Sequence, residues 1–298
     1  MAKSNVYREF IHPEDEAARQ QLEAIPGFPA LVKAFMAIGI ERMLHGVAMA
    51  RKLHISPTQM PELYNKLAKI CAKLQMEIPE FYLEMNPFPN AYTQGDTRVF
   101  ITVTSGLLEY LNDDELEAVI AHECGHIVCR HVLYKTVAML LTTGISNYSI
   151  NLGGLVLAPI KLAFLYWDRR SELSADRCAA AVCGDVEPVV ETMLRLSAGS
   201  KEITGNINLE EYMAQGKYYD ALMESKWDKL LLKSQTMYLN HPFPVVRVNE
   251  IKKWEKSNQY IRLATLMDEE NKGKICPICL GLINEEWLYC KHCGYKLN

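Results

Sequence analysis

The chain has 298 residues, of which 49% are hydrophobic and 23% charged, a composition that excludes a disordered or fibrous protein. Its 32 basic and 36 acidic residues give a net charge of −4, so no bulk field attracts nucleic acid, and we expect no nucleic-acid partner. Nine cysteines, an odd number that is unevenly spread, argue against a secreted disulfide framework and indicate a reducing, cytoplasmic compartment.

Residues 1–56 are predicted to form an N-terminal helical region. The first segment, Met1–Glu16, is rich in charged residues and has no apolar core, so it is not a secretory signal. The next apolar stretch, Ala30–Ala50, contains Lys33 and Glu41, which predicts an amphipathic helix rather than a membrane span. We recognise no catalytic motif in this region of the sequence.

A helix and two short strands are expected to follow. Ser56 or Thr58 can cap a helix that extends to Lys73, with leucine and isoleucine residues at helical spacing. The segments Glu80–Met85 and Arg98–Thr104 predict strands, separated by a turn-rich stretch. We expect Arg98–Thr104 to be an edge strand, to which an extended peptide could add through main-chain hydrogen bonds.

A long helix that begins at Asn112 carries the clearest chemical motif. Glu115 is placed to complete a capping box at its start. Further along stands the sequence His122-Glu-Cys-Gly-His126, which is the H-E-x-x-H pattern. Because successive helical residues turn by about 100°, the two histidines lie about 40° apart on one face and can bind the same metal ion.

The residue types in this pattern suit metal-assisted hydrolysis. His122 and His126 are candidate zinc ligands, and Glu123 beside them is suited to take a proton from the attacking water. Cys124 lies on another side of the helix, within a stripe of apolar residues, so we expect it to be buried packing rather than a metal ligand.

A second helix, from about Trp167 to a stop at Gly184, offers the missing ligand. A catalytic zinc needs three protein ligands and an open position, and Glu172 is the best candidate for the third ligand. Asp176 lies one turn further on the same face, where its carboxylate could accept the second ring N–H of a ligand histidine. Several alanines make one side of this helix thin, which would allow the first helix to approach closely.

Three sequence blocks, taken in order, resemble those of the HtpX-like zinc metalloendopeptidases, a group of gluzincins related to the CAAX-prenyl proteases. The first block runs from Asn90-Ala91-Tyr92 through the H-E-x-x-H helix, the second from Glu172 to Asp176, and the third is His241-Pro242 followed by Arg247. The resemblance covers about residues 57–255.

This resemblance implies an α+β, mainly helical fold, with a zincin-like metalloprotease core and a small β-sheet or hairpin. It implies an endopeptidase that hydrolyses unfolded or extended polypeptides, in protein quality control. In such families the two motif histidines and Glu172 bind zinc, and the motif glutamate is the general base. The resemblance also gives His241 a role in steadying the oxyanion or contacting the resting metal, and Asn90 and Ala91 a role in substrate binding.

The chain departs from the membrane members of this family, which carry strong transmembrane helices before the first motif and between the first and second. Here Thr136–Ile160 has no formal charge, but polar residues and the Gly153-Gly154 pair interrupt it. This pattern predicts a helix, a loop and a helix packed on the protein. We therefore expect a cytoplasmic enzyme, with peripheral contact to a membrane as an open alternative.

Residues 274–298 contain a second metal signal. Two C-x-x-C pairs, Cys276 with Cys279 and Cys290 with Cys293, predict a zinc ribbon that holds one structural zinc ion. A segment this short has no apolar core of its own, so the metal would hold it together. A redox pair is the alternative, but the βαβ context typical of such pairs is absent. The positive and negative charges of residues 274–298 nearly balance, which favours docking to a protein partner over binding of nucleic acid.

The sequence thus predicts an N-terminal helical region (1–56), a metallopeptidase domain (57–270) and a zinc ribbon (274–298), with one catalytic and one structural Zn²⁺. Two other functions stay open. One is a catalytically idle zincin that binds or scaffolds polypeptides. The other is a different H-E-x-x-H hydrolase, such as a deformylase, which usually takes an upstream cysteine ligand. The upstream Cys71 lacks the matching context.

Overall fold

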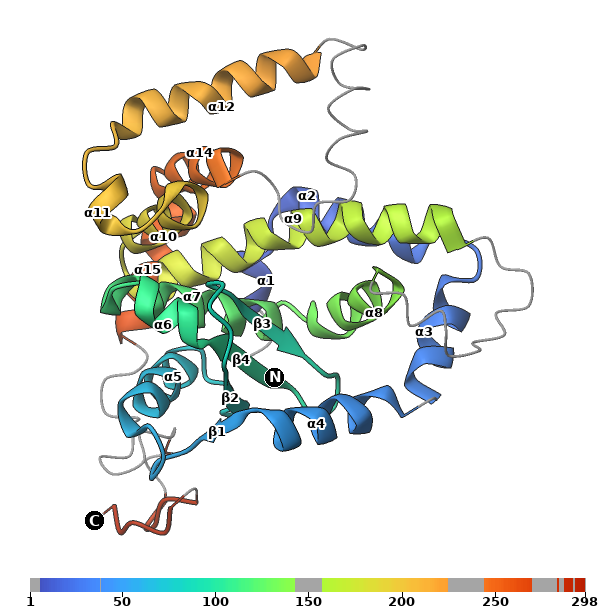
Figure 1. Ribbon diagram of the computed structural model, residues 1–298, viewed down its shortest axis with the longest axis vertical. Coiled ribbons are helices and arrows are strands. Elements are labelled where there is room, and N and C mark those ends of the chain that lie inside the picture. Colours follow the sequence, from blue (N-terminus) through green and yellow to red (C-terminus); the bar gives the residue numbers. More distant parts are fainter. Residues whose placement is uncertain are drawn as a thin grey trace.

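The computed structural model describes residues 6–37, 39–142, 157–224, 244–269, 283, 287–291 and 293–297. Within these ranges the chain is mainly helical and forms one four-stranded mixed sheet, which confirms the predicted α+β class. Two long helices, α7 (Asp113–Val128) and α9 (Leu157–Cys183), run side by side through the middle of the molecule (Figure 1).

The sheet corrects one prediction. Its strands are β1 (Leu53–Ile55), β2 (Glu80–Glu84), β3 (Ala91–Gln94) and β4 (Phe100–Thr104), in the order β1-β2-β4-β3. Strand β4 pairs in parallel with β2 and antiparallel with β3, and all five of its residues are buried. The expectation that Arg98–Thr104 is an edge strand was therefore wrong. The edge strands are β1 and β3, and β3 is too short and polar to stand out in the turn-rich stretch.

Helix α5 (Pro61–Lys73) begins later than expected. Ser56 does not cap it but closes a tight turn with Gln59, through two main-chain hydrogen bonds of 2.9 and 3.1 Å. The apolar stripe of α5 is buried as expected, and it packs against α7. Helix α6 (Ser105–Tyr110) follows β4 and is capped by the Thr104 side chain.

The N-terminal helices are α1 (Val6–Phe10), α2 (Pro13–Glu23), α3 (Phe28–Ala37) and α4 (Ile40–Arg51). Helix α2 lies along α9, and α3 packs beside α8 (Val132–Thr142). Their buried side chains, with those of α8 and α9, form a second apolar cluster around Phe28, Phe164 and Trp167. Among the helices within the described ranges, none is long and apolar enough to cross a membrane.

The remaining helices are α10 (Glu187–Ala198), α11 (Lys201–Thr204), α12 (Leu209–Glu224), α14 (Pro244–Glu255) and α15 (Asn258–Glu269). Gly199 and Gly205 follow the ends of α10 and α11, and α9 stops at Gly184 as expected, where the backbone takes a left-handed φ of 73°. In Figure 1, α10, α14 and α12 lie on the side of α9 opposite the sheet. Helices α7 and α9 therefore lie between these helices and the sheet.

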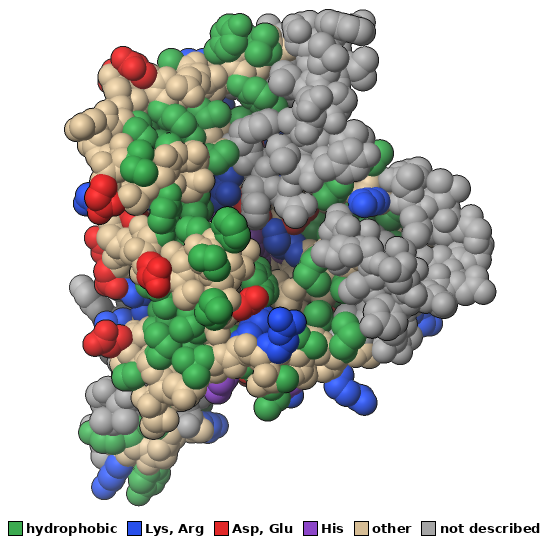
Figure 2. All heavy atoms as spheres, in the orientation of Figure 1, with side chains coloured by type: hydrophobic (Ala, Val, Ile, Leu, Met, Phe, Trp, Pro, Cys, Tyr) green, Lys and Arg blue, Asp and Glu red, His purple; other side chains and the backbone are tan. Residues whose placement is uncertain are grey.

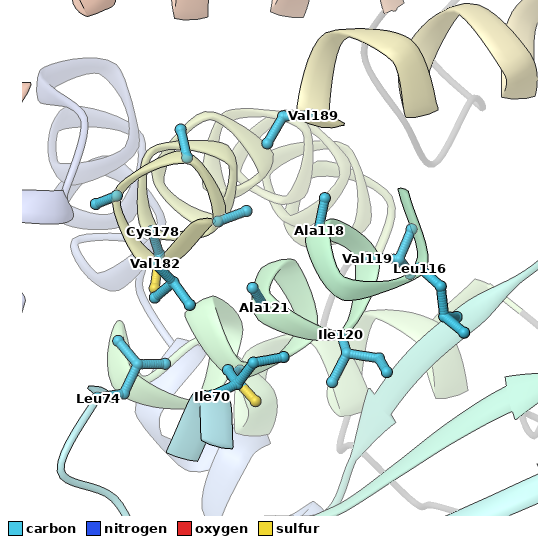
Figure 3. Packing of buried hydrophobic residues seen from close by; sticks show 14 of the residues in the cluster. Ile70, Leu74, Leu116, Ala118, Val119, Ile120, Ala121, Cys178, Val182 and Val189 are labelled. Atoms are coloured by element: carbon cyan, nitrogen blue, oxygen red, sulfur yellow. The ribbon is translucent and has the colours of Figure 1, made fainter. Parts of the chain in front are cut away.

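The main core is built around the contact of α7 with α9. Figure 3 shows side chains such as Ile70, Ile120, Cys178 and Val189 converging from α5, α7, α9 and α10. At Gly125 the two helices approach so closely that a Cβ atom would lie 2.9 Å from Cβ of Cys178 and 3.0 Å from Cα of Ala175. The thin, alanine-rich side expected for the second helix thus faces α7.

This close approach predicts the effect of adding one methyl group. Gly125→Ala should lower the free energy of unfolding by about 1–3 kcal/mol, because overpacking shifts the backbone of either helix. Gly46→Ala, in α4, is the matched control: nothing lies within 4 Å of its Cβ position, so alanine should stabilise the chain by about 0.5–1 kcal/mol. Urea unfolding of both variants measures the difference. Equal stability of Gly125→Ala and the parent would contradict the packing.

Candidate metal centre

Helix α7 brings the polar side chains of the motif together. Its start has the expected capping box, in which the side chains of Asn112 and Glu115 each accept the other residue's N–H at 2.9 Å. Further along the helix, His122, Glu123 and His126 have potential ligand atoms that all lie within 4.8 Å of one another. The two imidazole rings meet edge to face.

Helix α9 adds Glu172, which is 1% exposed. Its Oε2 lies 3.4 Å from Nε2 of His122, and its Oε1 lies 3.3 Å from Nε2 of His126. Zinc bonds of about 2.0–2.2 Å in a tetrahedron place neighbouring ligand atoms about 3.3 Å apart. The two imidazoles and the carboxylate therefore fit a zinc ion, by both their chemistry and their spacing.

Asp176 supports this group from one turn further along α9. Its Oδ1 is 2.9 Å from Nδ1 of His122, so the Nδ1–H of the ring can donate to it and leave Nε2 for a metal. Arg247, from α14, donates two hydrogen bonds to the same carboxylate, at 2.8 and 2.5 Å. Its third nitrogen, Nη1, lies 3.3 Å from Glu172. Arg247 thus links the two carboxylates of α9.

The surroundings perturb the two histidines in opposite directions. Burial lowers the pKa of His122, but hydrogen bonds to Asp176 and Glu172 outweigh it and raise that pKa to about 9 in the metal-free protein. Burial and the charge of Lys135 hold the pKa of His126 well below its usual value. Burial alone would raise the pKa of Asp176, yet Arg247 and His122 keep it low. One imidazole of the pair is therefore protonated at neutral pH and the other is neutral.

Glu123 lies beside the histidines and is 6% exposed. Its Oε2 accepts a hydrogen bond of 2.6 Å from the hydroxyl of Thr93, in the edge strand β3. This bond holds one carboxylate oxygen toward the sheet. Sequence reasoning missed Thr93, because no pattern within β3 marks it.

A half-buried lysine was also missed. Lys135, on α8, donates to Glu172 at 2.7 Å and to Asp168 at 2.8 Å. Burial would lower the pKa of Lys135, but these two carboxylates raise it above its usual value, so its side chain is a cation. The lysine lies in an otherwise apolar helix, and that isolated charge is the one signal that could have drawn attention to it.

Two cavities adjoin the group, and both are bordered by Asn90, Ala91, Glu123 and Glu172. The larger, of about 380 Å³, has a charged wall that includes Lys135. The smaller, of about 290 Å³, has an apolar wall that includes Leu107, Val119 and Met193. Figure 2 shows a hollow near the centre of this face, over the region where α9 and β3 lie in Figure 1, with Lys and Arg side chains inside it.

Strand β3 borders both cavities and has an open side. The carbonyl of Asn90 accepts from the N–H of Thr104, so Asn90 faces β4. Main-chain groups of successive residues alternate in direction, which turns those of Ala91 and Thr93 away from β4. These groups pair with no further strand of the described sheet, because β3 is at its edge.

The other predicted site residues divide into two sets. His241, Cys276 and Cys279 lie outside the described residues. Cys290 is buried and Cys293 is exposed, in a short C-terminal turn closed by a bridge between Tyr289 and Lys296. Cys124 is fully buried in the main core, as expected.

The sequence matches known proteins over most of its length. The family model of peptidase family M48 matches residues 57–255. The chain is 33% identical to the plastoglobule-localized metallopeptidase 48, chloroplastic, of Arabidopsis thaliana over 255 residues, which cover 85% of this chain and 74% of that protein. It is also 30% identical over 190 residues to a protease HtpX homolog of Trichormus variabilis, covering 54% of this chain and 66% of that protein.

A protease HtpX homolog of Nostoc sp. matches to the same extent, with 30% identity over 190 residues. The chain thus spans about two thirds of the length of these HtpX homologs. No solved structure matches the chain.

The protonation of His122 predicts how metal affinity changes with pH. The raised pKa of His122 stabilises the folded metal-free protein. This stabilisation is fully present below pH 6.5 and is lost as the pH rises through about 9. A metal must displace that proton, so its affinity should rise about tenfold per pH unit between pH 7 and 9 and then level off. Titration with Co²⁺ measures this affinity. The cobalt absorption bands that show no sulfur-to-cobalt charge transfer report on this site, because none of its proposed ligands is a cysteine. An affinity independent of pH would contradict it.

Proposed function

Because the chain belongs to peptidase family M48, and is thus a metallopeptidase, we propose that it is a zinc-dependent endopeptidase of the gluzincin type. The observation that carries this proposal is the spacing of 3.3 and 3.4 Å between Glu172 and the Nε2 atoms of His122 and His126. These three side chains would hold the zinc ion. When bound, zinc polarises the scissile carbonyl and makes water nucleophilic near neutral pH.

The proton transfers fall to Glu123. Its carboxylate takes a proton from the attacking water and delivers it to the nitrogen of the leaving amine. The hydroxyl of Thr93, 2.6 Å from Oε2, would hold the carboxylate in place while the other oxygen accepts the proton. Asp176 and Arg247 keep His122 oriented. By the resemblance described above, His241 would steady the oxyanion.

The substrate that this site would accept is an unfolded or extended polypeptide. The outward main-chain groups of Ala91 and Thr93 suit an extended chain added to β3, and such pairing reads little sequence. Cavities on both sides of Glu123 would take the side chains that flank the scissile bond. A peptide held through its backbone must be free of other structure, which supports a role in protein quality control.

The C-terminal residues would form a zinc ribbon. The N–H of Cys290 donates to the carbonyl of Tyr295 at 2.7 Å, and the N–H of Gly294 donates back to the carbonyl of Cys290 at 2.9 Å. Gly294 has a φ of 74°, a value that favours glycine, so the turn after Cys293 is tight. This tight turn supports one half of a Cys₄ site, completed by Cys276 and Cys279. The ribbon would dock a protein partner.

We place the enzyme in the cytoplasm, in peripheral contact with a membrane. Buried cysteines that form no disulfide, such as Cys71, Cys124 and Cys178, support that compartment. The exposed apolar side chains of α4, among them Met43, Val47 and Met49, support peripheral contact. The Arabidopsis relative is described as plastoglobule-localized, which concerns that protein alone.

Glu123→Gln tests the catalytic assignment. The variant should still bind zinc, because Glu123 is not a ligand, but it should cleave a reduced and alkylated protein about 100- to 10,000-fold more slowly. Glu117→Gln, a partly exposed residue of the same helix that pairs with Lys66, is the control and should cleave normally. The parent should leave the native, folded form of that substrate uncut.

The same cleavage assay distinguishes the proposed endopeptidase from the alternative functions. Cleavage retained by Glu123→Gln would overturn the role of this residue. A parent enzyme that carries zinc and binds the unfolded substrate without cutting it would instead be a capture module. Preferential cleavage of the folded form would contradict the proposed substrate class.

Metal analysis tests the ribbon. The parent chain should contain two zinc ions, and Cys276→Ser combined with Cys279→Ser should reduce this to one, because the remaining thiolates cannot hold the ion. Cys183→Ser, at a half-buried cysteine beside the core, is the control and should keep both. A zinc content that is unchanged in the double variant, by elemental analysis, would contradict the ribbon.

A further inference from the structure

A line of buried polar groups runs from His126 away from the face that meets Glu172. Nδ1 of His126 lies 2.9 Å from Nδ1 of His131, and Nε2 of His131 lies 3.0 Å from Oδ2 of Asp15. All three residues are 1% exposed. Asp15 belongs to α2, so this line connects the motif helix to the N-terminal part of the chain.

The end of α7 has the geometry that brings His131 next to His126. The helix closes with two main-chain bonds, from the N–H of His131 to the carbonyl of His126 and from the N–H of Arg130 to that of Ile127. This is the Schellman pattern, which needs a left-handed residue after the helix. Arg130 takes that conformation, with a φ of 61°, at a position where glycine is usual. The strained turn folds His131 back beside His126.

The residues around Asp15 and His131 hold the outer end of this line of polar groups in place. The hydroxyl of Ser174 donates to Oδ2 of Asp15 at 2.5 Å, and the N–H of His12 donates to that hydroxyl at 2.9 Å. The ring of Trp167 packs edge to face against His131. The position of Asp15 is therefore set by α9, the helix that also carries Glu172.

The proton positions in this line follow from the chemistry of imidazole. If Nε2 of His126 binds a metal, its proton is on Nδ1 and is donated to Nδ1 of His131. His131 then accepts at Nδ1, so its own proton is on Nε2 and is donated to Asp15. Each bond thus fixes the tautomer of the next ring.

The cost of burying Asp15 points to a function for it. A buried carboxylate loses several kcal/mol of hydration unless it is paired. Oδ1 of Asp15 has no hydrogen-bond partner among the residues that the structure describes, and outside the line only the charge of Arg19 is near enough to lower the pKa of this carboxyl. A positive charge at the other end of the line, on a metal held by His126, would offset part of this cost.

We propose that Asp15 and His131 are positioning residues of the metal centre, which hold His126 in the tautomer and orientation that bind the metal through Nε2. This inference rests on the zinc ligation proposed above. Residues 13–23 lie outside the family match, so the centre would depend on a helix that precedes the matched domain. Such outer hydrogen bonds typically contribute 10- to 100-fold to metal affinity.

Two substitutions of His131 separate positioning from packing. His131→Asn keeps an oxygen acceptor near the place of Nδ1, whereas His131→Phe keeps the volume and loses the acceptor. Both leave Asp15 without its imidazole partner, so any general destabilisation is shared. We expect His131→Phe to weaken Co²⁺ binding by about 10- to 100-fold, and His131→Asn to restore most of it. Competition with a chelator measures the Co²⁺ affinity. Following the cobalt bands that show no sulfur charge transfer separates this site from the ribbon, whose proposed ligands are cysteines.

Asp15→Asn tests the outer end, with Glu16→Gln as its control. Glu16 is the next residue of α2 and pairs with Arg19, outside the line. Asp15→Asn should weaken Co²⁺ binding by up to about tenfold, and Glu16→Gln should leave it unchanged. The combination Asp15→Asn with His131→Phe should bind as weakly as His131→Phe alone, because both act through one line.

Three outcomes would count against this inference. Equal cobalt affinity of the parent, His131→Phe and Asp15→Asn would overturn it, as would additive effects in the double variant. Equal losses in His131→Asn and His131→Phe would indicate packing instead of positioning. If the parent itself binds no Co²⁺ without sulfur bands, the zinc ligation fails instead. Circular dichroism of the metal-free variants shows that each is folded, and Asp15→Asn carries the test should His131→Phe not fold.

Discussion

The close packing of α7 against α9 is the constraint on which the rest of the molecule depends. At Gly125, which has no side chain of its own, α7 packs directly against Ala175 and Cys178 of α9. At this separation Glu172 reaches both histidines of the other helix. Metal–ligand distances vary by only about 0.2 Å between sites, so a bulkier contact would disrupt the proposed zinc site before the fold itself was lost.

The same packing concentrates negative charge in the interior. Four carboxylates are buried around one point, those of Glu123, Asp168, Glu172 and Asp176. Burying a carboxylate destabilises the fold unless a cation or a hydrogen-bond donor is paired with it. Lys135 and Arg247 supply the cations from two further helices. The centre therefore holds together helices far apart in the chain, and the charge of a bound metal would add to that cohesion.

Local patterns predicted what a single helix determines. The capping box at Asn112 and the shared face of His122 and His126 follow from helical geometry, and both appear as expected. The sequence could not reveal that β3 is an edge strand, because four residues carry too little pattern. It also could not pair Asp15 with His131, since residues 116 positions apart meet only through tertiary packing.

The proposed centre draws its members from almost the whole length of the chain, between Asp15 on α2 and Arg247 on α14. Synthesis runs from the N-terminus, and domains fold as units once their residues are available. The ribosome must therefore complete most of the chain before Arg247 can join the two carboxylates of α9. The proposed centre therefore stays incomplete in any chain that is still being made.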